Sequence, residues 1–192
     1  ASPLFLIEYA NVIYQIGFDA YYKKAAEAGI NYVLVPDAPL EESAPFVAAA
    51  AAHGIAHVFM IAPTTSDKRV KDIVEQAKLS HTDAATAVPF STFLYLVSVT
   101  GVTGSRKDVS HDTLACIKRV RALTDLPIIV GFGISKYEHV SEVLHAGASG
   151  VVTCSPIVDI VHNLSDNRAK MFKSIEGFIK QLQQKGAFIF IA

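Results

Sequence analysis

Three segments rich in glycine, serine and threonine follow directly after apolar stretches of the chain. Segments of this kind commonly bind phosphate groups. They are SVTGVTG at residues 98–104, GFGIS at residues 131–135 and CSP at residues 154–156. Glycine lets backbone N–H groups approach an anion, and the N-terminus of a following helix favours negative charge. The hydroxyl groups of Thr103 and Ser155 add two donors. Together the three segments predict a phosphate site.

The same segments have a simpler interpretation as tight turns between strands and helices. For one segment alone this interpretation is favoured, but three in succession favour phosphate binding. No lysine follows the glycines as in a P-loop, and the G-x-G-x-x-G pattern of dinucleotide-binding folds is absent. The sequence therefore argues for a bound phosphate ester and against nucleotide binding of these two kinds.

The other reactive side chains form no recognisable site. The seven histidines do not make an H-E-x-x-H motif, and no metal is expected. The lysines fall on expected helices, which disfavours Schiff-base chemistry. Ser98 and Ser155 lack the His and Asp partners of a hydrolase. Asp37 is the one carboxylate expected at the C-terminal end of a strand, where the neighbouring prolines favour a role in the turn over a role as a base.

The elements that must position these groups alternate between short apolar and longer amphipathic stretches. Strands are expected at residues 4–7, 32–35, 58–61, 93–97, 126–130, 150–153 and 187–191, and helices at residues 17–28, 41–52, 66–78, 110–123, 136–146 and 171–184. This alternation is typical of a parallel sheet covered by helices. The spacing suits a (β/α) barrel or a doubly wound sheet, and the chain is short for the ~250 residues of a complete barrel.

Composition excludes several classes of protein. The chain has 192 residues, which favours one domain, and its hydrophobic content of 51% excludes intrinsic disorder. A net charge of −1 gives no support for nucleic-acid binding. No apolar stretch reaches the ~20 residues of a membrane-spanning helix. We therefore expect a cytoplasmic protein without a targeting segment, in which Cys116 and Cys154 are buried thiols.

Five motifs, in order along the chain, resemble the α subunit of tryptophan synthase. They are YAN at residues 9–11, VPDAP at 35–39, APTT at 62–65, SVTGVTG at 98–104 and VGFGIS at 130–135. The resemblance implies an α/β fold of the (β/α) TIM-barrel type, entered at the family's third strand. Residues 1–192 would then form a single barrel domain that is incomplete or rearranged. It also implies a lyase of tryptophan biosynthesis, which cleaves indole-3-glycerol phosphate to indole and glyceraldehyde 3-phosphate without a cofactor.

The resemblance further assigns residues to the substrate and to a partner. The residues expected to bind the phosphate are Thr103, Gly104, Phe132, Gly133 and Ser155. The residues expected to contact the indole from inward-facing strand positions are Ile7, Tyr9, Leu34, Met60 and Tyr95. From periodicity alone, a place in the plain barrel core is the favoured alternative for these five. Asn11 and Asp37 match family positions that face the β subunit.

The family's two catalytic carboxylates have no counterpart in the matched residues, and Tyr95 is the remaining candidate for a catalytic side chain. In the family, a Glu protonates the indole ring and an Asp stabilises charge on its nitrogen. Residues 87–92 resemble the end of the family's second strand, but that match places Ala85, which transfers no proton, at the position of the Glu. Residues 186–192 resemble its first strand. We therefore expect impaired cleavage or, as the alternative, a non-catalytic phosphate-binding or engineered barrel scaffold.

Overall fold

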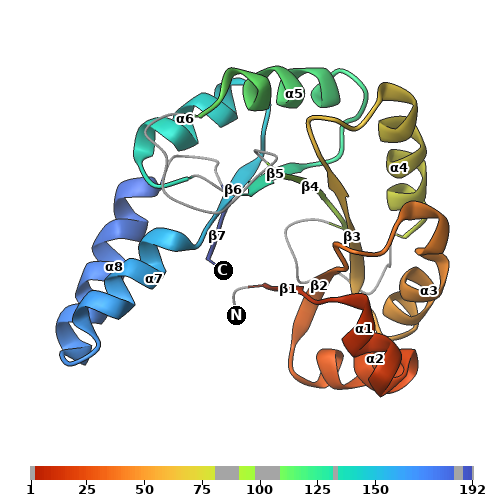
Figure 1. Cartoon of the computed structure of the whole chain (residues 1–192), viewed down its shortest axis with the longest axis horizontal. Coiled ribbons are helices and arrows are strands. Elements are labelled where there is room, and N and C mark those ends of the chain that lie inside the picture. Colours follow the sequence, from red (N-terminus) through yellow and green to blue (C-terminus); the bar gives the residue numbers. More distant parts are fainter. Residues whose placement is uncertain (1–2, 81–90, 98–108, 132–133, 184–187, 192) are drawn as a thin grey trace. The chain divides into compact units, whose positions relative to one another are not determined.

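The computed structural model describes residues 3–80, 91–97, 109–131, 134–183 and 188–191. Residue contacts divide the chain into two compact units, whose elements are labelled in Figure 1. The first unit comprises Ala1–Ile61, Ser66–Tyr95 and Thr124–Pro127, and the second comprises Ala62–Thr65, Leu96–Leu123 and Ile128–Ala192. The boundary falls in the middle of strand β4 (Leu94–Val97), so each unit contains half of that strand.

The first unit is a parallel sheet with helices between its strands. Its strands are β1 (Leu4–Ile7), β2 (Ile30–Leu34), β3 (Ala56–Ile61) and the first half of β4, in that order in the sheet. Its helices are α1 (Ala10–Ile16), α2 (Phe18–Glu27), the short 3₁₀ helix η1 (Leu40–Glu42), α3 (Ala44–Ala52) and α4 (Asp67–Leu79). The strand and helix alternation expected from the sequence is confirmed.

The second unit continues the same pattern. Its strands are the second half of β4, β5 (Ile128–Gly131), β6 (Gly150–Thr153) and β7 (Phe188–Ile191), again in chain order. Its helices are α5 (His111–Arg121), α6 (Tyr137–His145), α7 (Ser155–Leu164) and α8 (Arg168–Leu182). The apolar C-terminal segment thus forms a strand, which pairs in parallel with β6 along its whole length. No described helix is long and apolar enough to span a bilayer.

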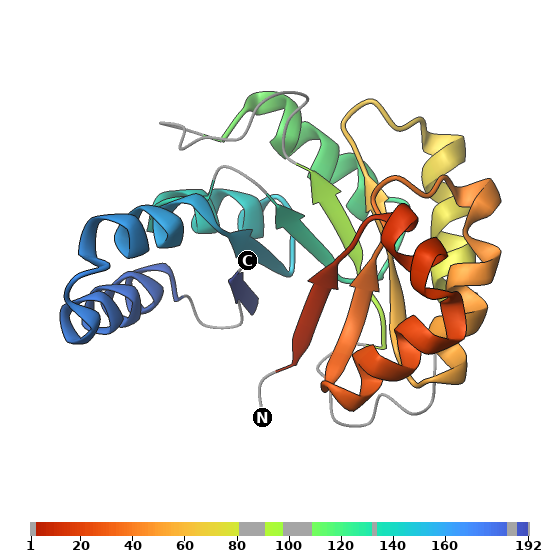
Figure 2. The same ribbon diagram turned by 60° about the horizontal axis from the view of Figure 1, so that its bottom comes forward.

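The hydrophobic core of the first unit lies between its sheet and its helices. Tyr22 of α2, Phe46 of α3 and Val33 of β2 have no exposed surface and pack together in this core. Figure 2 shows α2 and α3 on one side of strands β1 to β3. The core residues of these elements pack together on that side. Burial of three such large side chains contributes several kcal/mol, at roughly 1.5–3 kcal/mol for each.

Polar side chains define where several helices begin. The hydroxyl of Ser66 accepts a hydrogen bond from the Arg69 N–H at the start of α4, and Ser110 does the same for the Thr113 N–H at the start of α5. Such caps satisfy backbone N–H groups that have no partner inside the helix and stabilise it by ~1 kcal/mol. Both starts agree with the helices predicted from residues 66 and 110.

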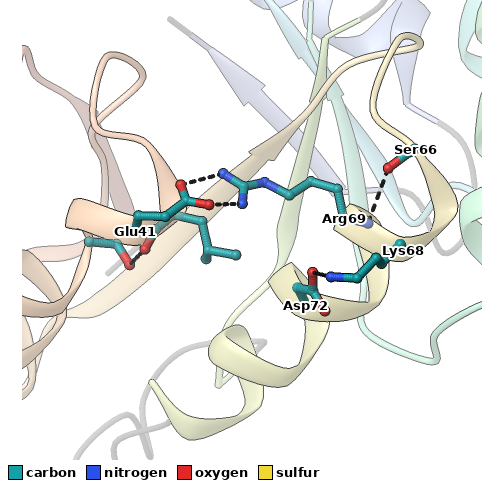
Figure 3. A network of polar contacts seen from close by, with 7 residues as sticks. Glu41, Ser66, Lys68, Arg69 and Asp72 are labelled. Carbon is teal, nitrogen blue, oxygen red and sulfur yellow. Dashed lines mark hydrogen bonds and ion pairs between the residues drawn. The ribbon is translucent and has the colours of Figure 1, made fainter.

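An exposed ion pair joins α4 to η1 (Figure 3). Arg69 donates two hydrogen bonds to the Glu41 carboxylate, one of them 2.7 Å long from Nη2 to Oε2. These bonds lower the pKa of Glu41 to about 2. Lys68 and Asp72 lie one turn apart on α4, and the distance from Lys68 Nζ to Asp72 Oδ2 is 3.0 Å. Both pairs face solvent, so dissolved salt screens them and they contribute little to stability.

Two helices, α1 and α7, are missing from the sequence-based prediction. Both contain several β-branched residues, which have low intrinsic helix propensity and resemble strand residues in a sequence. Gly17 lies between the end of α1 and the start of α2. Its φ of 89° is a backbone conformation that glycine adopts without strain. Pro156 lies in the first turn of α7, where a missing N–H costs no hydrogen bond.

Candidate functional site

The expected indole-contacting residues come mostly from one face of the first unit's sheet. Leu6 and Val33 pack toward the helices. Successive residues of a strand point to opposite faces, so their neighbours Ile7 and Leu34 point away from the helices. The register places Ile7 beside Leu34 and Leu34 beside Val58. We call this side of the sheet the inner face.

Two more of the expected residues belong to the inner face. Met60 is two residues beyond Val58 on β3 and therefore shares its direction. The Tyr95 ring of β4 contacts the Phe5 ring, which lies two residues before Ile7 on β1. Leu34 and Tyr95 are buried, and Met60 is partly exposed. Strands β1 to β4 thus bring Ile7, Leu34, Met60 and Tyr95 onto one apolar surface.

An aromatic cluster on the inner face was not foreseen from the sequence. The Phe93 ring lies 5.2 Å from that of Phe5 and 5.0 Å from that of Tyr32, both edge to face, and Tyr95 lies 6.0 Å from Phe5. Such ring pairs add ~1 kcal/mol each beyond the burial of their area. The signal was available, because Phe5, Tyr32 and Phe93 each stand two residues before a residue expected to face inward.

The carboxylates near the ends of β1 and β2 accept hydrogen bonds from backbone N–H groups at the start of α1. Glu8 Oε1 accepts a hydrogen bond of 2.8 Å from the Tyr9 N–H, and Asp37 Oδ1 accepts one of 2.9 Å from the Ala10 N–H. Tyr9 does not occupy the inward-facing strand position expected for it, because β1 ends at Ile7 and Tyr9 is the exposed residue immediately before α1. Asn11 is exposed on that helix. Asp37 therefore ties the turn after β2 to α1, in agreement with the structural role expected from its prolines.

Replacing Asp37 by alanine is expected to lower the free energy of unfolding by about 1 kcal/mol, the usual cost of losing a side-chain acceptor at a helix start. Asp37→Asn retains an oxygen that can accept from the Ala10 N–H and is the matched control. Urea unfolding of the three proteins measures the difference. Equal stability of wild type and Asp37→Ala would contradict the capping role.

In the second unit the structure locates one of the five expected phosphate-binding residues. Ser155 is the first residue of α7, one residue after Cys154 and two after the end of β6. Pro156, the second residue of α7, has no N–H group, and the Ile157 N–H donates to the Cys154 carbonyl at 2.8 Å. Thr103, Gly104, Phe132 and Gly133 lie outside the described residues. The expectation that Cys154 is buried is wrong, since it is the exposed residue that joins β6 to α7, whereas Cys116 is buried as expected.

Two buried side chains hold the turn that follows β5. Thr153, the last residue of β6, donates a hydrogen bond of 2.8 Å from its hydroxyl to the Ile134 carbonyl. His139 of α6 accepts a hydrogen bond of 3.3 Å at Nδ1 from the Ser135 N–H. Thr153 is 1% exposed and His139 is fully buried. The end of β6, which leads to Ser155, is therefore joined directly to the turn between β5 and α6.

The APTT motif also has a structural role in the second unit. The Thr65 hydroxyl accepts a hydrogen bond of 3.0 Å from the Ala62 N–H, which closes a compact turn. Arg119 of α5 donates to the Pro63 carbonyl at 3.2 Å. The motif therefore fixes the segment after β3 against α5, and nothing in its contacts requires a ligand.

Histidines four residues apart at the end of α3 and on β3 do not converge. His53 binds the exposed Asp19 carboxylate through Nε2 at 2.8 Å. His57 points into the helix side of the sheet, where its ring contacts those of Phe46 and Phe59. Its Nδ1 has no hydrogen-bond partner in the described part of the chain, and burial lowers its pKa to about 4. Across the described residues, no group of three His, Cys, Asp or Glu side chains could hold a metal ion.

Parallel strands in chain order, with helices between them, define a protein of the (β/α) barrel class. The model of the tryptophan synthase alpha chain family matches residues 1–187, so the chain belongs to that family. The alpha chain of Methanoregula boonei is 41% identical over 182 residues, which cover 95% of this chain and 64% of the relative. That of Methanothermobacter thermautotrophicus is 40% identical, with 96% and 63% covered.

A solved structure supports the same assignment. The tryptophan synthase a2b2 complex of Pyrococcus furiosus contains a chain with a TM-score of 0.76 and 30% identity, over 94% of this chain and 66% of that one. The (β/α) barrel class and the family expected from the sequence are thus confirmed. The chain spans a little under two thirds of the length of these relatives.

Proposed function

We propose that the chain binds indole-3-glycerol phosphate in the manner of its family. The phosphate is held in the second unit by Thr103, Gly104, Phe132, Gly133 and Ser155. The indole contacts Tyr9 and the inner face of the first unit, at Leu34, Met60 and Tyr95. The observation that carries the proposal is the position of Ser155 at the start of α7. Thr153, two residues earlier, donates its hydroxyl to the Ile134 carbonyl in the turn after β5.

The chemistry of the second unit supports phosphate as the ligand group. The dipole of α7 favours an anion close to Ser155, at the N-terminus of the helix. A hydroxyl at that position adds a donor whose direction can rotate toward a phosphate oxygen. Turns after the last strands of a (β/α) barrel are a recurrent place for phosphate.

The inner face suits a flat apolar ring. Met60 is partly exposed on this apolar face, on which Leu34 and Tyr95 are buried. The aromatic cluster of Phe5, Tyr32 and Phe93 lies on the same face. An indole placed there would displace water from apolar surface, and this burial contributes roughly 25 cal/mol of binding free energy for each Å². Tyr95 is the candidate among these residues for a hydroxyl that touches the reacting ring.

Cleavage of the substrate needs a positioned acid that delivers a proton to carbon. The two carboxylates closest to the ends of β1 and β2 are those of Glu8 and Asp37. Glu8 accepts a hydrogen bond from the Tyr9 N–H, and Asp37 accepts one from the Ala10 N–H. We therefore propose that these 192 residues, tested alone, bind the substrate but release indole slowly. No cofactor is required by this reaction.

We also propose a β subunit as the partner, with Asn11 and Asp37 at the contact. Asn11 and Asp37 are both exposed, and the Asp37 hydrogen bond to Ala10 places the two on adjoining segments. The similar chain from Pyrococcus furiosus is part of an a2b2 complex.

Indole release from indole-3-glycerol phosphate, with and without an added β subunit, tests the catalytic part of the proposal. We expect little turnover in both cases, and turnover well above the uncatalysed background would contradict impairment. Binding is tested separately by the midpoint of thermal unfolding, which the substrate should raise. Ser155→Ala should weaken this binding about tenfold, as expected for a hydrogen bond to a charged group. Ser174→Ala on α8 is the control, and no thermal shift of wild type would refute the site.

A further inference from the structure

Thr153 is a buried hydroxyl residue at the end of an otherwise apolar strand. The sequence of β6 is GVVT, and all four residues are buried. A buried hydroxyl is costly unless it finds a partner, and Thr153 satisfies its donor with the Ile134 carbonyl at 2.8 Å. That carbonyl belongs to the neighbouring turn and not to the sheet. The bond therefore joins the end of β6 to the segment that follows the adjacent parallel strand β5.

His139 of α6 forms a hydrogen bond with the same turn. Its Nδ1 accepts the hydrogen bond of the Ser135 N–H at 3.3 Å, although the ring has no exposed surface. An imidazole nitrogen that accepts a hydrogen bond carries no proton. Ile134 and Ser135 are thus held through a carbonyl and an N–H by two buried side chains. Because the Ser135 N–H is already used, it is not available to an anion.

We infer that Thr153 and His139 are positioning residues for the phosphate site, which hold the turn at Ile134–Ser135 in register with Ser155. The inference rests on the proposed phosphate binding in the second unit. Neither side chain touches the phosphate. They fix the distance between the turn after β5 and the start of α7, and a site that must surround a small dianion depends on that distance.

Substitutions that remove one hydrogen bond at constant shape test the role of Thr153. Thr153→Val has almost the same volume and no hydroxyl, whereas Thr153→Ser retains the hydroxyl. We expect Thr153→Val to raise the dissociation constant for inorganic phosphate about tenfold, the effect of roughly one lost hydrogen bond. Thr153→Ser should stay within about twofold of wild type. Titrations followed by ³¹P NMR, with potassium chloride to keep ionic strength constant, give the constants.

A matched control separates positioning from a general loss of stability. Thr92 is also 1% exposed and donates its hydroxyl to a backbone carbonyl, that of His57, at 3.1 Å in the first unit. Thr92→Val should lower the thermal midpoint as much as Thr153→Val does and leave phosphate affinity unchanged. If both valine variants weaken phosphate binding equally, the inference is wrong.

His139 provides a second, independent pair of variants. His139→Leu removes the acceptor and should weaken phosphate binding, whereas His139→Asn offers an oxygen near the position of Nδ1 and should retain most of it. Unchanged affinity in Thr153→Val and His139→Leu, with wild type binding phosphate, would overturn the positioning role alone. Absence of phosphate binding by wild type would overturn the proposed site together with it.

Discussion

Lowering the pH from 6.5 to 4 is expected to reduce the free energy of unfolding by about 3 kcal/mol through one side chain, that of His57. Its ring is 3% exposed and is packed against Phe46 and Phe59. Burial lowers its pKa from 6.5 to about 4. The unfolded chain therefore binds a proton in this interval that the folded chain does not bind, and each pH unit shifts the balance by about 1.4 kcal/mol toward unfolding.

The contribution of His57 has a defined pH window. Its cost to folding is absent well above pH 6.5, where the ring is neutral in both states. The cost grows as the pH falls and levels off below the folded-state pKa of about 4. His57→Leu has a similar volume and no titratable nitrogen, so it should remove this part of the pH dependence. Urea unfolding at several pH values measures the difference between the two proteins. Parallel stability curves for wild type and His57→Leu would contradict the assignment.

Replacing Gly150 by alanine is expected to separate β7 from β6. A methyl group on Gly150 would lie 2.2 Å from the Phe188 carbonyl oxygen and 3.0 Å from its carbonyl carbon, both backbone atoms of the paired strand. Gly150 is aligned with Phe188 in the register, so the clash falls at the first pair of the ladder. We expect a loss of about 1–3 kcal/mol in unfolding free energy, the usual cost of forcing extra volume into a packed region.

Limited digestion with chymotrypsin measures the separation directly, since this protease can cleave after Phe188 and Phe190 once β7 leaves the sheet. Cleavage at these residues should be faster in Gly150→Ala than in wild type. Gly177→Ala is the control, because an added methyl group at that exposed position of α8 meets no atom within 4 Å. In a helix interior this control should be stabilising by up to ~1 kcal/mol. Equal digestion of Gly150→Ala and wild type would refute the β6–β7 pairing.

The order of strands and helices could be predicted from the sequence, because apolar runs of four to six residues and glycine after helices are local signals. The helix α1 could not, since Val12 and Ile13 read equally well as strand residues until Gly17 is seen to turn the chain at a positive φ. Its start also depends on Asp37, a residue 27 positions away from Ala10. A contact of that range leaves no local signal.

The direction of two candidate site residues came from the family resemblance. It assigns Leu34 and Met60 to inward-facing positions, and the strand register places both on one face of the sheet. The hydrogen bond from Thr153 to Ile134 was not foreseen, because a threonine at the end of a strand is common and its partner depends on the spacing of two adjacent strands. For the same reason the burial of His57 between Phe46 and Phe59 required the structure.

The tyrosines are distributed very unevenly between the two units. The chain has seven tyrosines and no tryptophan, and only Tyr137 belongs to the second unit, where it is exposed. Near-ultraviolet circular dichroism should therefore record the melting of the first unit almost alone. A tryptophan introduced at the exposed Phe172 of α8 would give the second unit a fluorescent reporter of its own. The two signals, followed in one denaturant titration, would reveal whether the halves of the molecule unfold as a single cooperative body.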